Sequence, residues 1–270
     1  MTTFVLGQHY YQSALSLAHA SLAAYHPHPN EYAPFAQSGF GKVIPFTSDQ
    51  NKDGGAISGY VASRDDAILL AFRGTVDVQN WLTNLDVLQT EYLGAMVHSG
   101  FLSALMSVWQ PIDKAIRDEV GQGGKRKIWI TGHSLGGALA TLATRRLLNM
   151  NLAPLETYTF GQPRVGDKAF ASQITSTFYR FTYNMDPVTF VPFLVYKTLN
   201  YEHVGQLKYI AEDGNVYDSP SKWMQTAQML LTLTAPKFKS FLLERLKDHS
   251  MDGYVSRMKV YIDRLNKSYK

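Results

Sequence analysis

The stretch from Lys127 to Ala140, KIWITGHSLGGALA, places one serine between two glycines, directly after an apolar run and directly before a helix-forming run. Gly132 and Gly136 lie two residues before and two residues after Ser134, which lets the backbone crowd into a turn that larger side chains would block. The stretch therefore predicts a strand, a sharp turn and a helix. At the tip of such a turn, the free N–H groups and dipole of the helix favour developing negative charge, as a nucleophilic serine requires. The alternative is a chance match to this short pattern in a loop.

Short apolar runs alternate with helical stretches along the rest of the chain. We predict strands at 67–75, 127–133, 155–161, 178–183 and 206–212, and helices at 99–119, 135–151 and 167–177. Several of the apolar runs are nearly continuous, which is typical of strands buried on both faces. The repeated order of strand, helix and strand predicts an α/β fold, with a mainly parallel central sheet and helices on both faces. A chain of 270 residues with 45% apolar content and no low-complexity linker is expected to form a single domain over residues 1–270.

Composition excludes several classes of protein. The formal net charge is +4 and the lysines and arginines are scattered, so we expect no nucleic-acid partner. The absence of cysteine excludes disulfides, thiolate metal sites and a cysteine nucleophile, and neither a metal nor a cofactor is expected. No apolar run approaches the length of a membrane span. The N-terminus does not fit a signal peptide, so the localisation is open: cytoplasmic, or exported by a route that the sequence does not show.

Five motifs occur in a fixed order along the chain. They are AFRGT followed by QNW (71–81), VHSGF (97–101), GHSLGGALA (132–140), YTFGQPRVGD (158–167) and NMDPVTFVP (184–192). Together they resemble the class 3 lipase family, the fungal-type triacylglycerol lipases, from about Leu69 to Tyr254. The resemblance implies an α/β-hydrolase fold and hydrolysis of esters by a serine. Because the family also includes phospholipases and feruloyl esterases, the resemblance implies the chemistry more firmly than the substrate.

The acid and the histidine of a catalytic triad should follow Ser134 in that order. Asp186 comes just after a predicted strand, whose end can present a carboxylate to the site; the alternative is a turn-forming Asp-Pro. Two histidines fit the last position. His203 lies directly before a strand, whereas His249, in LKDHSMDGYV, resembles the D-H-x-x-Y stretch that carries the family's base. We therefore expect His249 to be the catalytic base, with His203 as the alternative.

An oxyanion hole requires two hydrogen-bond donors beside the nucleophile. The first is expected from the backbone N–H of Leu135, at the start of the helix after Ser134. The resemblance places the second at Thr75, through its backbone N–H and, as an open option, its hydroxyl; an ordinary threonine at a strand end is the alternative. His133, inside the turn, and His98 are expected to be structural.

Two further segments do not extend the predicted sheet. In the segment 76–89, one apolar stripe recurs at helical spacing, with polar residues between its members: Val78, Trp81, Leu82 and Leu85. A stripe of this kind often packs permanently on a core, but its position beside the oxyanion loop favours a mobile lid. Class 3 lipases carry a lid helix with a tryptophan in the matching place. The segment 221–247 is expected to be a helical insert that either walls the acyl pocket or packs in the core.

These expectations indicate a serine carboxylester hydrolase that acts on acylglycerols at a lipid–water interface through an acyl-enzyme. A lipid ester would be its substrate and the interface its partner. A phospholipase A1 and an esterase for soluble esters, including feruloyl esters, remain alternatives within the same chemistry. A catalytically dead hydrolase scaffold that binds a partner is an alternative of a different class.

Overall fold

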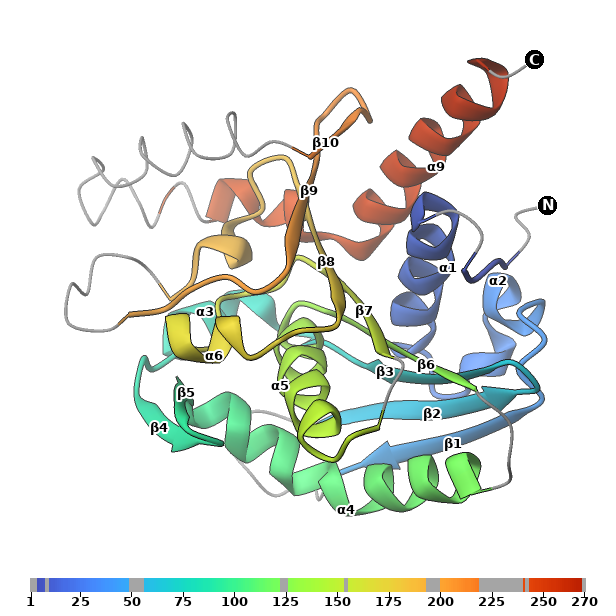
Figure 1. Cartoon of the computed structure of the whole chain (residues 1–270). Coiled ribbons are helices and arrows are strands. Elements are labelled where there is room, and N and C mark those ends of the chain that lie inside the picture. The colour runs from blue at the N-terminus through green and yellow to red at the C-terminus, as the bar shows by residue number, and fades with distance from the viewer. Residues whose placement is uncertain are drawn as a thin grey trace.

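An eight-stranded sheet runs through the computed structural model, which describes residues 4–7, 10–48, 56–121, 126–152, 155–192, 200–218, 240 and 243–268 (Figure 1). In spatial order its strands are β1 (Lys42–Thr47), β2 (Ser58–Arg64), β3 (Ala67–Phe72), β6 (Lys127–His133), β7 (Leu155–Phe160), β8 (Thr177–Tyr183), β9 (Gln206–Ile210) and β10 (Val216–Tyr217). Strands β3, β6, β7, β8 and β9 are parallel, while β1, β2 and β10 pair antiparallel. A separate hairpin joins β4 (Gln89–Tyr92) to β5 (Ala95–His98).

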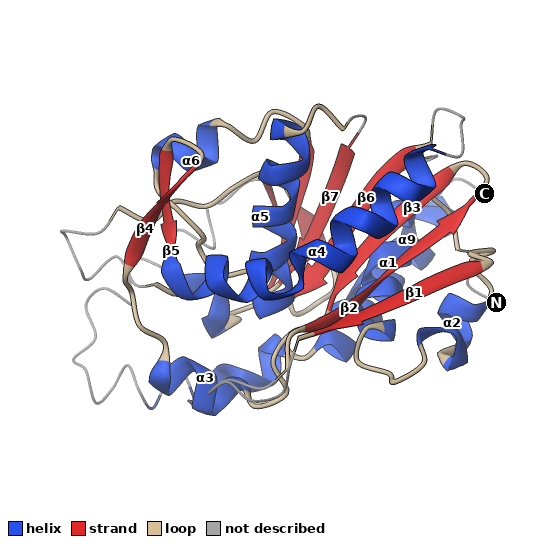
Figure 2. Cartoon of the chain, turned by 90° about the horizontal axis from the view of Figure 1, so that it is seen from below, coloured by secondary structure: helices blue, strands red, loops and turns tan. Residues whose placement is uncertain are grey.

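Helices cover both faces of the sheet. Figure 2 shows α4 (Ser99–Gly121) and α5 (Leu135–Asn149) in front of the strands, with α1 (Tyr10–Ala23) and α9 (Met251–Ser268) behind them. The shorter helices are α2 (Ala33–Ala36), α3 (Val78–Asn84) and α6 (Lys168–Ser172), together with the 3-10 turns η1 (Pro29–Glu31), η2 (Pro187–Phe190) and η3 (Leu246–His249). Among the described residues, no helix is both long and apolar enough to cross a bilayer.

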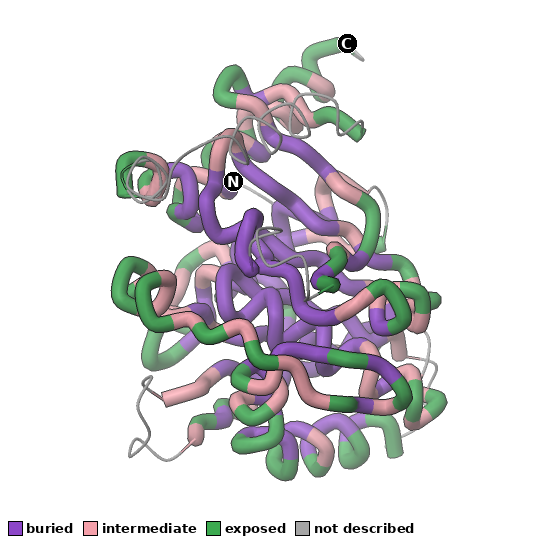
Figure 3. The backbone as a smooth tube through the Cα atoms, turned by 90° about the vertical axis from the view of Figure 1, so that its left-hand side faces the viewer, coloured by how far each residue is buried: buried purple, intermediate pink, exposed green. Residues whose placement is uncertain are grey.

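The helices enclose two apolar cores, one on each face of the sheet. Strand β3 is buried along its whole length, as its continuous apolar sequence predicts. Successive side chains of a strand point to opposite faces. Accordingly, Ile68 and Leu70 pack in the core beneath α4 and α5, and Leu69 and Ala71 in the core beneath α1 and α9. In Figure 3 the buried residues gather in the interior of the molecule, and the exposed residues lie mainly at its periphery.

The predicted α/β class and mainly parallel sheet are confirmed, with some boundaries moved. Strand β3 ends at Phe72, three residues before the predicted end, and α6 covers only Lys168–Ser172 of the predicted 167–177. Most of the predicted insert at 221–247 lies outside the described residues, which there comprise 240 and 243–247. Because β6, β7 and β8 are parallel, the loops after them meet at one edge of the sheet, where α/β proteins place their sites.

Candidate active site

Ser134 lies in a strained turn between β6 and α5. Its φ of 59° and ψ of −130° are outside the conformations that a serine ordinarily adopts. A Cβ on Gly132 would lie 2.1 Å from the carbonyl oxygen of Gly136, and one on Gly136 would lie 2.5 Å from that of Phe72. The Ser134 N–H donates to the carbonyl of Phe160, 3.0 Å away at the end of β7. The two glycines therefore permit the turn, and the neighbouring strand fixes it.

Asp186 and His249 form a buried pair at the same edge of the sheet. The Nδ1 atom of His249 lies 2.9 Å from both carboxylate oxygens of Asp186, and neither side chain is appreciably exposed. The carboxylate also accepts hydrogen bonds from the Tyr254 hydroxyl at 2.6 Å and from the Val188 N–H at 2.9 Å. Burial and the adjacent carboxylate raise the pKa of Tyr254 well above its ordinary value, so it stays protonated as a donor. Because an ionised carboxylate only accepts, Nδ1 carries the proton and Nε2 of a neutral ring is the basic nitrogen.

Two buried side-chain atoms, one in the serine turn and one in the Asp186–His249 pair, share an unusual property. Within the described residues, neither Oγ of Ser134 nor Nε2 of His249 has a hydrogen-bond partner. Buried polar atoms without partners are rare and call for an explanation. Catalytic hydrogen bonds are often long in a protein without substrate and tighten when substrate binds, so the catalytic roles predicted for the two residues would account for both atoms together.

Gly161 makes room for the pair of side chains. It follows β7 with a φ of 59°, and a Cβ there would lie 2.6 Å from Oδ2 of Asp186 and 2.9 Å from the ring of His249. Only glycine combines this backbone conformation with so close an approach. The motif YTFGQPRVGD contains Gly161, but the sequence alone did not indicate this role.

His203, the alternative base, lies in a different environment. Burial, followed by the charges of Arg180 and Arg164, lowers the pKa of His203 well below its ordinary value. Burial also lowers the pKa of Arg164 to about 10 and that of Arg180 to about 9. His249, and not His203, bonds to Asp186. The geometry therefore favours His249 as the base, and the catalytic role of each residue stays a prediction.

The loop after β3 passes over the serine turn. A Cβ on Gly74 would lie 2.6 Å from the His133 carbonyl oxygen and 2.9 Å from the Cβ of Ser134. Thr75 is the next residue in the chain and is half-buried. Leu135 begins α5, where the first N–H groups of a helix have no partner within it. Both predicted donors to an oxyanion thus belong to segments that adjoin Ser134.

The predicted lid segment forms the short helix α3 beside this loop. Asp77 caps it by accepting a hydrogen bond from the Asn80 N–H at 2.9 Å. Trp81 is half-buried, and its indole stacks on the Phe101 ring with centroids 6.2 Å apart and planes 18° apart. Leu85 also packs against the core beneath α4 and α5. Two members of the apolar stripe, Trp81 and Leu85, therefore face the core in this structure, and no residue of α3 is fully buried.

Two large apolar residues that flank α3 are strongly exposed. Val76 and Leu88 are 80% and 64% exposed, unusually high values for large apolar side chains. The segment after α3 is anchored by His98, whose Nε2 donates to the Asp86 carbonyl at 2.7 Å. The Tyr201 hydroxyl bonds to the Leu88 carbonyl at 3.3 Å. His98 thus contacts the segment that follows α3, at the boundary of the predicted lid.

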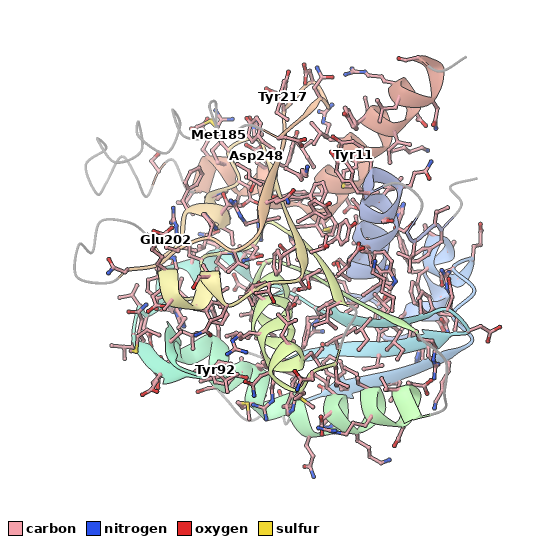
Figure 4. All side chains as sticks on the ribbon, viewed as in Figure 1. Tyr11, Tyr92, Met185, Glu202, Tyr217 and Asp248 are labelled. Carbon is pink, nitrogen blue, oxygen red and sulfur yellow. The ribbon has the colours of Figure 1, made fainter. Side chains whose placement is uncertain are left out.

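Asp248 joins the loops that carry Asp186 and His249. Its carboxylate accepts hydrogen bonds from Asn184 Nδ2, at 3.1 Å, and from the Met185 N–H. Figure 4 shows Asp248 and Met185 next to each other. Burial raises the pKa of Asp248. The sequence did not single out this residue, because only the fold brings the two loops together.

Comparison with known proteins shows which proteins this chain resembles. Residues 69–196 match the family model described as lipase (class 3). The chain is 33% identical over 171 residues to the secreted mono- and diacylglycerol lipase A of Penicillium cyclopium, covering 61% of this chain and 55% of that protein. It is 39% identical over 149 residues to the secreted mono- and diacylglycerol lipase 1 of Fusarium solani, covering 52% and 44%. The chain thus spans about half the length of these curated relatives.

A solved structure extends the likeness to the fold. The lipase from Rhizopus microsporus var. chinensis superposes with a TM-score of 0.67 at 27% identity, covering 76% of each chain. The part of this chain that matches the family model, residues 69–196, includes Ser134, Gly161 and Asp186. The predicted α/β-hydrolase architecture is thereby confirmed.

Proposed function

We propose that this chain, whose residues 69–196 match the class 3 lipase family, is a serine carboxylester hydrolase that cleaves acylglycerols at a lipid–water interface. The observation that carries the proposal is the buried Asp186–His249 pair beside the strained turn of Ser134. Among the residues that the structure describes, Nε2 of His249 and the hydroxyl of Ser134 are buried without partners. A scaffold that only binds a partner has no need for a buried, hydrogen-bonded carboxylate and a strained turn, both of which are costly to maintain.

The arrangement supports a two-step mechanism. Nε2 of His249 removes the proton of the Ser134 hydroxyl as Oγ attacks the ester carbonyl carbon, and Asp186 holds the ring and stabilises the imidazolium. The backbone N–H groups of Leu135 and Thr75 stabilise the oxyanion that forms. The intermediate then collapses, and His249 passes its proton to the departing alcohol. Water attacks the acyl-enzyme with His249 again as the base, which releases the carboxylic acid and restores the serine.

The proposed substrate follows from the surroundings of the site. The two curated relatives reported above are named mono- and diacylglycerol lipases. Val76 and Leu88 extend the apolar character of α3 onto the surface, where apolar side chains favour contact with a lipid phase. Acylglycerols presented at an interface fit both features better than a dissolved ester does.

The test is a panel of substrates given to the same purified protein. Emulsified triolein, emulsified diolein, phosphatidylcholine vesicles and dissolved p-nitrophenyl butyrate are compared, with the Ser134→Ala variant as the blank. We expect faster turnover of the acylglycerols than of phosphatidylcholine. A preference for phosphatidylcholine would reassign the chain as a phospholipase A1. Hydrolysis of the dissolved ester alone would reassign it as a soluble esterase. Failure of a fluorophosphonate to label Ser134 would refute the hydrolase proposal itself.

A further inference from the structure

Tyr25, which follows α1, contacts the histidine next to the nucleophile. Its hydroxyl lies 2.8 Å from Nδ1 of His133, and Nε2 of His133 lies 2.7 Å from the backbone carbonyl oxygen of His249. A carbonyl oxygen only accepts, so Nε2 of His133 carries a proton. Burial, together with the neighbouring His249, lowers the pKa of His133 well below its ordinary value, which keeps the ring neutral. Nδ1 is therefore an acceptor, and the Tyr25 hydroxyl donates to it.

The other side of the Tyr25 hydroxyl meets the loop after β3. The backbone N–H of Gly74 donates to the phenolic oxygen. A Cβ on Gly74 would lie 2.3 Å from that oxygen, so only glycine allows the loop to come this close. The donors therefore all point the same way: Gly74 donates to Tyr25, and Tyr25 donates to His133. At its other nitrogen, His133 donates to the carbonyl of His249.

The two ends of this series of hydrogen bonds lie in segments that carry residues of the proposed reaction. Gly74 directly precedes Thr75, the proposed oxyanion donor, and His249 is the proposed base. The His133 ring also stacks on the His249 ring, with centroids 4.4 Å apart and planes 29° apart. Proton transfer requires the base within hydrogen-bond reach of the serine, and an oxyanion donor must lie about 3 Å from the developing charge. Both distances therefore depend on where these two segments are held.

We propose that Tyr25 and His133 are positioning residues that hold the oxyanion loop and the base in one fixed arrangement around Ser134. The inference rests on the proposed hydrolase function and assigns a role to two residues that do not touch the ester. A misplacement of about 1 Å can cost about a hundred-fold in rate even when it originates away from the reacting atoms. Loss of the Tyr25 hydroxyl should therefore lower kcat and leave KM nearly unchanged.

The test compares Tyr25→Phe with a matched control, Tyr60→Phe. The Tyr60 hydroxyl is buried and donates to the carbonyl of Ala20 at 2.8 Å, so its removal disturbs the same helix α1 but not the hydrogen-bond chain. Melting temperature, kcat and KM for p-nitrophenyl butyrate, and the rate of fluorophosphonate labelling are measured for each variant. We expect similar losses of melting temperature in both variants. Tyr25→Phe alone should lose about ten- to a hundred-fold in kcat and in labelling rate, the range for one buried hydrogen-bonding group left unpaired.

A double-mutant cycle tests whether the two residues act as a unit. If they do, Tyr25→Phe combined with His133→Phe will be little slower than His133→Phe alone, because the chain is already broken. His133→Gln, which keeps an amide donor, replaces His133→Phe in the cycle if the latter does not fold. Losses that multiply fully, or a kcat for Tyr25→Phe equal to that of Tyr60→Phe, would overturn the inference while the wild-type protein remains active. An inactive and unlabelled wild-type protein would overturn the proposed function, and the positioning role with it.

Discussion

The Tyr254 hydroxyl donates a 2.6 Å hydrogen bond to Oδ2 of Asp186, although it lies five residues after His249 in the chain. The D-H-x-x-Y pattern that the sequence resembles would place a tyrosine three residues after the histidine. Here the tyrosine comes from a later position in α9 and still contacts the acid. It also accepts a hydrogen bond from the Tyr183 N–H at 3.0 Å, so it joins the strand before Asp186 to the helix after His249.

Tyr254→Phe should therefore reduce catalysis as well as stability. The variant removes one of the donors to a buried carboxylate and leaves the Tyr183 N–H without its acceptor. We expect kcat for p-nitrophenyl butyrate to fall by about tenfold, which corresponds to about 1.4 kcal/mol. Tyr158→Phe is the control, because the Tyr158 hydroxyl also donates to a carboxylate, that of Glu156, away from the site. Equal effects of the two substitutions on kcat would show that the bond to Asp186 has no catalytic importance.

The two candidate histidines should differ sharply when each is replaced by alanine. His249→Ala removes the ring that bonds to Asp186, so the loss should approach that of Ser134→Ala, about a million-fold in kcat in a comparable serine hydrolase. His203 packs near Arg180 and Arg164, so His203→Ala should cost mainly stability and keep kcat within about tenfold, the change produced by about 1.4 kcal/mol. Initial rates together with melting temperatures separate the two effects. The reverse ranking of rates would transfer the role of base to His203.

Thr75→Val tests how the oxyanion loop contributes. Valine keeps the backbone N–H and nearly the shape of threonine but has no hydroxyl. If the hydroxyl also donates to the oxyanion, kcat should fall by about a hundred- to a thousand-fold, the range measured for one lost donor. Such a loss would fall on kcat with little change in KM, because the oxyanion exists only in the transition state and the intermediate. A kcat equal to that of the wild type would assign the whole contribution of Thr75 to its N–H.

Glu119 lies at the end of the sheet away from the site, and it should make the stability of the fold sensitive to acid. It is buried at the end of α4, where its carboxylate binds Lys42 at 2.6 Å and Arg126 at 3.0 Å. Burial would raise the pKa of Glu119, but hydrogen bonds from Lys42, Ser63 and Arg126 give a net lowering. A lowered pKa in the folded state means that the stabilisation is present above the ordinary pKa of a glutamate. It is lost as the pH falls through the folded-state value.

Glu119→Gln should accordingly reduce the free energy of unfolding at pH 7 by about 1–3 kcal/mol, the cost of leaving hydrogen-bonding partners imperfectly satisfied. The difference from wild type should shrink as the pH falls below about 4.3, the ordinary pKa of a glutamate. Urea unfolding at pH 7 and at successively lower pH measures both quantities. A difference that stays constant down to the lowest pH at which both proteins fold would contradict the ionic role of Glu119.

The features that could be predicted from the sequence are those that depend on residues close together along the chain. The turn at Ser134 could be predicted because its steric requirement is met by Gly132 and Gly136, and the parallel strands because they are continuous apolar runs. The choice between His203 and His249 could not be made from spacing, since it depends on which loop lies against Asp186. The contact between Tyr25 and His133 joins residues 108 positions apart, so no local pattern indicates it.

The strands missed by sequence analysis have a physical reason as well. Strand β1 includes Pro45 and lies at the edge of the sheet as far as the structure describes it, where a proline is tolerated because no described strand pairs with its other side. Its sequence, KVIPFT, has neither a continuous apolar run nor a clean alternation, so it gives a weak signal.

The α3 helix was predicted from its apolar stripe. Such a stripe has the same pattern in the sequence whether the helix is fixed or mobile.

Trp81→Ala distinguishes a mobile lid from a fixed helix at α3. The indole stacks on Phe101 in this structure, and Trp81 and Leu85 of the apolar stripe pack against the core. At a lipid surface the stripe could turn outward, because the interface solvates apolar side chains and an indole suits the boundary between apolar and polar phases. The activity of the wild-type protein on emulsified tributyrin should then rise sharply once the substrate exceeds its solubility. Trp81→Ala should weaken that rise more than it weakens hydrolysis of dissolved p-nitrophenyl butyrate.

The control for this comparison is Gln79→Ala, on the exposed face of the same helix, which should leave both activities near those of the wild type. Rates are measured across the solubility limit for all three proteins. A fixed helix predicts a different result, because Trp81 would then contribute only packing against Phe101. Removing it would lower stability and both activities by the same factor, and the rate curve of the wild-type protein would saturate smoothly without a break at the solubility limit. That outcome would contradict the mobile lid and favour a hydrolase for dissolved esters, whereas a break that Trp81→Ala reduces selectively can arise only if α3 responds to the interface.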